Sequence, residues 1–317
     1  MKGSRGALVV SAGTRKSFTL LWVFLFVLSL LLQYARFATP PSVAAVHDLG
    51  LFELDGNAVN QAAAGNDWDQ VYGGTSAANS TQFITDLTDS QNDDSFTGGG
   101  TKDDLPISSW LWKNAKVGQP KNDIANAFAA AYTATNGDTI AYFGLDKIEA
   151  DGDNFVGFWF FKNQVGKSGP GTAPGSPFTG SHSVGDILVL ADYTNGGSVA
   201  SFNVYKWVGS GGNVNGTLQT VETGVECGAQ ANDDACGKTN ADLENSPWPF
   251  QGRDTAANKF GPGTFFEAGL NLSVLGLDTG CFTTFLAETR ASQSVDATLS
   301  DFALGQFSFC VPPQIQT

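Results

Sequence analysis

The chain has 317 residues, of which 42% are hydrophobic and 15% are charged, and it contains 38 glycines and 24 phenylalanines. Five of its 17 basic residues precede Asp48 and all 31 acidic residues lie at or beyond it, so residues 46–317 hold 12 basic and 31 acidic residues, a net charge of −19. This composition excludes a coiled coil and a wholly disordered chain, and so acidic a surface excludes nucleic acid as a partner because it repels phosphate backbones.

The N-terminus has the pattern of a secretory signal. A basic stretch is followed by residues 18–32, a run of 15 residues without a charge. That run is shorter than the about 20 apolar residues of a membrane-spanning helix, and it fits the apolar core of a signal peptide. Small residues at Val43 and Ala45 predict cleavage after Ala45, which gives a signal peptide at 1–45 and one domain at 46–317. The alternative is an uncleaved signal anchor, which would be the chain's contact with a membrane.

Short segments rich in aromatic and β-branched residues alternate with turn residues along the rest of the chain, which is typical of an all-β protein. The predicted strands are 49–54, 139–147, 154–162, 186–193, 199–208, 218–222, 264–272, 281–289, 295–299 and 307–311. Turn residues at 151–152 and 194–198 predict two hairpins, one joining 139–147 to 154–162 and one joining 186–193 to 199–208. We therefore predict a two-sheet β-sandwich of jelly-roll type with long loops.

Two segments of this region have distinctive patterns. Segment 154–162 is apolar on both faces, which predicts a central strand with Trp159 in the core. Segment 123–132, with the sequence DIANAFAAAY, has helical character and begins at a possible cap, Asn122 or Asp123. It is the one short helix that we predict.

The cysteines predict two disulfides. All four lie after the signal, and an even number in an exported chain favours disulfide bonds. Four cysteines allow three pairings, of which we favour Cys227–Cys236, closing a short polar loop, and Cys281–Cys310, linking two late strands. Zinc is not expected, because the sequence has neither a C-x-x-C pair nor a histidine near the cysteines.

Few patterns indicate catalysis. His47 lies at the expected start of the mature chain, and His182 lies in a loop without a nucleophile motif beside it. Residues 236–239 (CGKT) end like a phosphate-binding loop, but Asn232 stands where that motif requires glycine. Paired carboxylates on strands would suit a glycan-active enzyme. The candidates are Glu222, Glu267 and Glu288.

Acidic turns could hold a structural calcium ion, because calcium prefers oxygen ligands. The strongest candidate is the turn that holds Asp151, Asp153 and Asn154, and further acidic turns lie at 92–94 and 103–104. None has the spacing of an EF-hand, and solvated turn acids are the alternative interpretation.

Exposed aromatic rings would offer a stacking surface for sugars. Trp248 is the main candidate, because Pro247 and Pro249 exclude a central strand and favour an extended loop. Trp110 and Trp112 are further candidates, although their alternation places both on one face of a strand, which is more often a core face.

Several strings resemble, as a set, a family of uncharacterised secreted and cell-surface proteins of bacteria over residues 48–310. They are FELDGN (52–57), FTGGGTKD (96–103), WLW (110–112), KNDI (121–124), GFWFF (157–161), GDIL (185–188), FLAETRAS (285–292) and DF (301–302). The chain is more remotely similar to jelly-roll modules of the DOMON and family 9 carbohydrate-binding type. The resemblance implies an extracellular β-sandwich and supplies no catalytic residues. Family members often continue into stalk repeats and a sorting signal, whereas this chain ends at Thr317, so wall anchoring is not predicted.

Together these features favour a secreted or cell-surface, non-enzymatic β-sandwich domain for binding or adhesion. Its expected partner is an extracellular glycan or a surface protein, and the only cofactor considered is structural calcium. The alternative is a secreted glycan-active enzyme that uses paired carboxylates.

Overall fold

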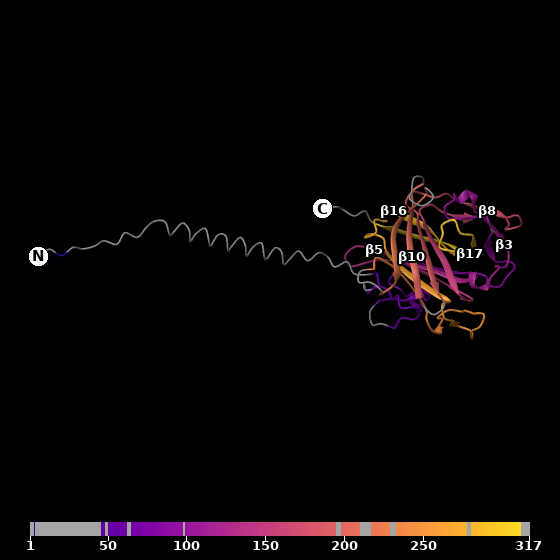
Figure 1. Ribbon diagram of the computed structural model, residues 1–317. Helices are drawn as coiled ribbons and strands as arrows, with labels where there is room; N and C mark the ends of the chain where they lie inside the picture. Colours follow the sequence, from indigo (N-terminus) through magenta and orange to yellow (C-terminus); the bar gives the residue numbers. More distant parts are fainter. Residues whose placement is uncertain are drawn as a thin grey trace. The chain divides into compact units, whose positions relative to one another are not determined.

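The computed structural model describes residues 3, 46–47, 50–61, 65–97, 99–194, 198–209, 217–228, 233–277 and 280–311. The chain divides into two compact units, 1–43 and 44–317, and the second contains the folded domain (Figure 1). The predicted signal peptide lies, apart from Gly3, outside the described residues. Within the described residues, no helix has the length and apolar character needed to cross a membrane. Val46 is buried in the folded domain and donates its N–H to the Asp233 carbonyl at 2.8 Å.

Two large antiparallel sheets form a β-sandwich, as the sequence predicts (Figure 1). The first contains, in spatial order, β1 (Ser80–Thr85), β4 (Ile124–Thr133), β5 (Thr139–Lys147), β15 (Phe265–Asn271) and β12 (Ala235–Thr239). The second contains β11 (Leu218–Glu226), β10 (Ser198–Trp207), β9 (Ile187–Thr194), β6 (Asp153–Phe161), β16 (Gly280–Arg290) and β17 (Leu299–Val311).

Smaller elements complete the domain. From β17 the second sheet continues through β2 (Asp94–Phe96), β3 (Leu111–Asn114), β8 (Ser176–Thr179) and β7 (Gly166–Lys167). A short parallel pairing between β11 and β12 joins the two sheets at one edge. The remaining elements are the helix α2 (Trp68–Tyr72), a two-stranded sheet of β13 (Glu244–Asn245) and β14 (Lys259–Phe260), and 3₁₀ turns at Ile107–Ser109 and Pro120–Asn122.

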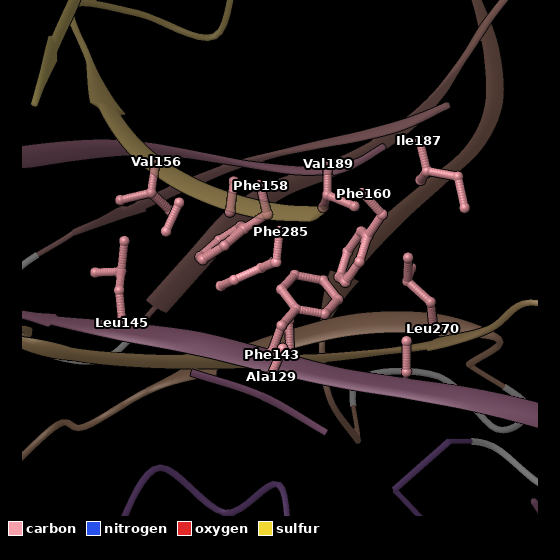
Figure 2. Close-up of a cluster of buried hydrophobic side chains, with 14 of the residues drawn as sticks. Ala129, Phe143, Leu145, Val156, Phe158, Phe160, Ile187, Val189, Leu270 and Phe285 are labelled. Carbon is pink, nitrogen blue, oxygen red and sulfur yellow. The ribbon is translucent and has the colours of Figure 1, made fainter. Parts of the chain in front are cut away.

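The main core lies between the two sheets and consists largely of phenylalanine and aliphatic side chains (Figure 2). The ring of Phe143 on β5 faces the ring of Phe158 on β6, with their centroids 4.9 Å apart. Ala129 on β4 pairs with Phe143 across the first sheet, so a small side chain lies beside a large one on the inner face. Such interdigitation fills the interior at the density of a native core.

The predicted helix at 123–132 is wrong, because this segment forms β4. Alternate residues of β4 belong to different cores: Ala127, Ala129 and Ala131 pack between the sheets, whereas Phe128 and Ala130 pack on the outer face. Since both faces are buried, the segment lacks the apolar–polar alternation that marks a half-exposed strand. The one helix of the described residues is α2, which Asp67 caps with its side chain.

The predicted hairpin of 139–147 with 154–162 is also wrong. Both strands exist, as β5 and β6, but β5 pairs with β4 and β15, whereas β6 pairs with β9 and β16. The turn between them therefore crosses from one sheet to the other. Both strands are apolar on both faces, and the sequence could not show that they pack face to face.

The other predicted strands agree with the structure to different degrees. The hairpin of β9 with β10 is confirmed, although residues 195–197 of its turn lie outside the described residues. In the described part of segment 49–54, a single bridge joins Phe52 to Asn66 instead of a strand. Segment 295–299 is not a strand of its own, because β17 begins at Leu299.

Both outer faces of the sandwich are covered by further apolar layers. The N-terminal segment, α2 and residues 248–260 cover the first sheet, with Phe52, Trp68 and Trp248 among the buried side chains. The β3–β8 region covers the second sheet. Loops that look polar in composition therefore carry single large rings that close these outer faces.

The two predicted disulfides are confirmed. Cys227 is bonded to Cys236, and Cys281 is bonded to Cys310. The second pair consists of directly opposite residues on β16 and β17. Two disulfides indicate folding in an oxidising environment.

Candidate functional site

The prediction that Trp248 is exposed is wrong. Its side chain is 2% exposed, and its indole N–H donates to Oδ2 of Asp146 at 2.8 Å. The ring packs against Phe83 and Phe128, with centroid distances of 4.9 and 5.3 Å. The flanking prolines do keep this residue out of a central strand, but the loop lies over the outer face of the first sheet and buries the ring there.

Trp110 and Trp112 are buried as well, at 0% and 6% exposure. Their indole N–H groups donate to the carbonyl oxygens of Lys102 and Ser168 at 2.9 and 3.0 Å. A buried indole N–H requires such a partner, and both rings belong to the layer that covers the second sheet. The three predicted rings therefore offer no stacking surface to a sugar.

Glu267 connects Gly56 and Trp68, which precede the first strand of the domain, to the first sheet. It is fully buried on β15, where Oε1 accepts from the Gly56 N–H at 2.7 Å and Oε2 accepts from the indole N–H of Trp68 at 2.9 Å. Burial raises the pKa of Glu267 well above its usual value. The buried side chain of Asp67 lies close enough for its charge to interact with Glu267.

Glu288 belongs to a buried ionic group on the second sheet. The Arg290 guanidinium binds both Asp103 and Glu288, and all three side chains are 0% exposed. Asp103 also accepts from the indole N–H of Trp159 at 2.7 Å. Because Glu288 and Glu267 are fully buried on different sheets, they do not form a catalytic pair, and the third candidate, Glu222, is half-buried on β11.

His182 is packed among other side chains and is not accessible as a catalytic base. Its side chain is 3% exposed and stacks on Trp207 with ring centroids 3.8 Å apart. Nδ1 lies 3.2 Å from Oδ2 of Asp186, which also accepts from the Ser183 N–H. Likewise, residues 236–239 form most of β12 instead of a phosphate-binding loop.

The turn predicted to bind calcium already has lysine partners. Lys121 donates from Nζ to the carbonyl oxygens of Asp151 and Asp153, both at 3.2 Å. Lys147 donates from Nζ to Oδ1 of Asn154 at 2.7 Å, and this ammonium and amide are both buried. Lysine ammonium groups thus take up oxygens that a cation would need.

A different set of carboxylates can hold a metal ion. Asp86, Asp93 and Asp301, here called the acidic cluster, each place one oxygen within 4.8 Å of the others. Asp93 and Asp301 are 0% exposed, and no N–H group in the described part of the chain donates to either oxygen of Asp93. Burial raises the pKa of Asp86 to about 8 and that of Asp93 to about 7.

Sequence reasoning found only part of the acidic cluster. Asp93 lies in the acidic turn at 92–94, but Asp86 and Asp301 had no signal of their own. The pairing of Ser95 on β2 with Asp301 on β17 brings Asp301 close to Asp86 and Asp93. A second group, His47, Asp233 and Cys236, meets the same distance criterion, but the sulfur of Cys236 is in a disulfide and is not a thiolate ligand.

Two cavities are together called the polar groove here, and the larger is lined in part by the loop between Asp86 and Asp93 of the acidic cluster. The larger, of about 410 Å³, is lined by Thr88, Asp89, Ile148, Gln251, Gly252 and Arg253. The smaller, of about 290 Å³, is lined by Gln119, Pro120, Lys121, Glu149 and Asp151. An ion pair between Arg253 and Glu149, 3.9 Å apart, links the two linings.

The comparisons with known proteins return no match: none of the family models, curated proteins or solved structures is similar to this chain. The acidic cluster and the polar groove are therefore the features from which function is argued.

Proposed function

We propose that this chain is an extracellular, non-enzymatic β-sandwich domain that binds a glycan in the polar groove. The observation that carries the proposal is the composition of the groove lining, to which Thr88, Asp89, Gln251 and Arg253 contribute residues with a hydroxyl, a carboxylate, an amide and a guanidinium group. These groups supply both donors and acceptors, as sugar hydroxyls require. The larger cavity, at about 410 Å³, is within the usual size range of ligand sites.

The extracellular setting rests on independent observations. Both disulfides favour an oxidising environment, and the N-terminal sequence has the pattern of a signal peptide. The resemblance to secreted bacterial β-sandwich proteins supports the same location. The net charge of −19 over residues 46–317, which follows from 12 basic and 31 acidic residues, favours a neutral glycan over an acidic one.

A binding role fits the positions of the carboxylates better than a catalytic role. A glycosidase needs two carboxyl groups on either side of the scissile bond. Glu267 and Glu288, the strand residues that would have provided them, instead stabilise the fold from fully buried positions. Hydrogen bonding by the groove, without ring stacking, is then the expected mode of recognition.

A structural calcium ion has two candidate sites in this domain, and its binding does not depend on that of a glycan. The turn at 151–154 is a poor site, because lysine ammonium groups already bind its oxygens. The acidic cluster is the better donor set, since it has buried oxygens to which no N–H group of the described residues donates, and the loop between two of its members lines the groove.

A glycan array probed with the secreted protein tests the proposal. We expect a neutral glycan to bind with weak dependence on salt, because few charges are neutralised. Arg253→Ala should weaken that binding about 10-fold or more through loss of a charged hydrogen-bond donor, while the melting temperature stays unchanged because Arg253 is half-exposed. Val184→Ala, at a residue 67% exposed and outside the groove lining, is the matched control. Equal binding by Arg253→Ala and the wild type would exclude the groove as the site.

A further inference from the structure

Three chain segments meet at the acidic cluster. Asp86 follows the end of β1, Asp93 immediately precedes β2, and Asp301 lies on β17. The main chain fixes each position: the Asp86 N–H donates to the Ala125 carbonyl at 2.9 Å, and the Asp93 N–H donates to the Ser90 carbonyl at 3.3 Å. Asp301 accepts from the Ile124 N–H at 2.8 Å. The three carboxylates are therefore placed by the fold and not by flexible side chains alone.

The acidic cluster brings negative charges together without enough hydrogen-bond donors around them. Asp93 is 0% exposed, yet no N–H group of the described residues donates to either of its carboxylate oxygens or to the buried Oδ2 of Asp86, so the two carboxyl groups have mainly each other as polar neighbours. Taking an ionised carboxylate out of water without a partner costs several kcal/mol. Asp123 adds a fourth carboxyl group, whose charge raises the pKa of Asp93 after burial itself.

Nearby lysines do not balance this charge. Lys167 lies close enough for its charge to interact with Asp86 and Asp93, but its ammonium is bound to Asp94. Lys116 is bound to Asp89. Among the described residues, no lysine or arginine forms an ion pair with Asp86, Asp93 or Asp301.

We propose that Asp86, Asp93 and Asp301 bind one calcium-type divalent cation, which fixes loop 86–93 as a wall of the polar groove. The donor set consists of carboxylate oxygens, which hard cations such as calcium prefer over softer transition metals. Calcium accepts six to eight oxygen ligands in flexible geometry, so water molecules can complete the shell around these three residues.

The ion would act on the groove through the loop between its ligands. Thr88 and Asp89 line the larger cavity, and they lie between Asp86 and Asp93 in the chain. The Asp89 N–H also donates to Oδ2 of Asp123 at 2.9 Å. The link to ligand binding rests on the proposed function, whereas cation binding itself does not.

Calorimetric titration of the chelator-treated full-length secreted protein with calcium chloride tests the inference. We expect one ion per chain with a dissociation constant on the order of 0.1–1 mM, as in extracellular calcium modules. At a calcium concentration 100 times the dissociation constant, the melting temperature should rise by about 5 °C. Magnesium should bind at least about 10-fold more weakly, because it demands near-ideal octahedral geometry.

Asp93→Asn and Asp153→Asn form a matched pair of variants, since each removes one acidic charge. Asp93→Asn should weaken calcium binding about 10-fold or more and so reduce the calcium-dependent thermal shift by at least about half. Its calcium-free melting temperature should be equal to or above that of the wild type, because it removes a buried unpaired charge. Asp153→Asn, at an exposed residue whose side chain lies outside the acidic cluster, should behave like the wild type.

Three results would overturn the inference: no calcium binding at 10-fold above the expected dissociation constant, unchanged binding by Asp93→Asn, or loss of binding in Asp153→Asn. The groove is tested separately. Chelation should weaken glycan binding by the wild type, and Arg253→Ala should lose glycan binding while it keeps calcium binding. Calcium binding without any glycan binding would overturn the proposed function but leave the cation site standing.

Discussion

Replacement of Trp248 by phenylalanine is the most direct test of how the outer layer of the first sheet is built. The ring is 2% exposed, and its N–H donates to Asp146 at 2.8 Å. Trp248→Ala would remove a hydrogen-bond donor from the buried carboxyl group of Asp146. It would also leave a cavity, which should lower the free energy of unfolding by about 3–5 kcal/mol. That loss is a large fraction of the total stability of a typical domain, about 5–15 kcal/mol. Phenylalanine keeps most of the apolar volume, so it isolates the hydrogen bond.

The cost of Trp248→Phe should depend on pH. Burial raises the pKa of Asp146 to about 7, so the carboxyl group is protonated at pH 5 and ionised at pH 9. A hydrogen bond to an ionised group is worth about 1.5–3 kcal/mol, and a neutral one about 0.5–1.5 kcal/mol. Trp248→Phe should therefore destabilise the domain by about 1 kcal/mol more at pH 9 than at pH 5. Two hydrogen bonds from Asn126 to the Asp146 oxygens, at 3.0 and 3.1 Å, remain in both cases.

Urea unfolding with the disulfides intact, followed by tryptophan-independent circular dichroism, measures these free energies. Asp146→Asn provides the second arm of a double-mutant cycle, in which the pH dependence of Trp248→Phe should disappear. Val184→Ala should change the stability by less than about 0.5 kcal/mol, as an exposed surface substitution does. If Trp248→Ala cost less than about 1 kcal/mol, the ring would not be in the core, and a role as an exposed stacking surface would again have to be considered.

Three further predictions use the same unfolding assay. Burial lowers the pKa of Lys147 to about 7, so between about pH 7 and 10 its amine is protonated in the unfolded chain but neutral in the folded domain. The free energy of unfolding of the wild type should therefore rise with pH over that window, by up to about 1.4 kcal/mol per pH unit, and Lys147→Met should lack the rise. The same slope in both proteins would contradict this. Arg290→Met should cost about 3–5 kcal/mol, because it leaves Glu288 buried without its cation; a cost below about 1 kcal/mol would show that the ionic group is not closed to water. Replacing Cys281 and Cys310 by alanine should cost about 1 kcal/mol more than replacing the other pair, since the disulfides span 29 and 9 residues; the reverse order would show that native-state effects dominate.

The parts of the fold that could be predicted are those with strong local signals. β5, β9, β10, β15 and β16 match predicted segments closely, because β-branched and aromatic residues between glycine-rich turns define them. Both disulfides followed from position: one closes a short loop, and the other joins directly opposite residues of β16 and β17. These features depend on residues close together in sequence or on a single pairing.

The errors arose where burial on both faces removed the local pattern. The alanines of β4 have high helix propensity, but packing between two apolar layers overrides it. The turn at 148–152 looks like a hairpin, yet β5 and β6 lie in different sheets. No local feature of the sequence distinguishes a hairpin turn from one that crosses between the sheets.

The candidate site could be predicted only in part for a related reason. Tryptophans in polar, proline-containing loops suggest exposure, but each predicted ring finds a buried acceptor, as Trp248 does in Asp146. The acidic cluster depends on the pairing of β2 with β17, a contact between residues about 200 positions apart that a single sequence does not encode visibly. The groove likewise combines loops from distant parts of the chain.

Three of the strings on which the predicted resemblance to secreted bacterial proteins rests contain residues that hold the fold together. Gly56 of FELDGN binds Glu267, and Asp103 of FTGGGTKD binds Arg290 of FLAETRAS. Asp301 of the last string belongs to the acidic cluster. By contrast, Gln251 and Arg253 of the groove lie outside every string. The predicted resemblance thus rests in part on residues that build the sandwich, whereas the specificity of the binding that we propose must be sought in groove residues outside the strings.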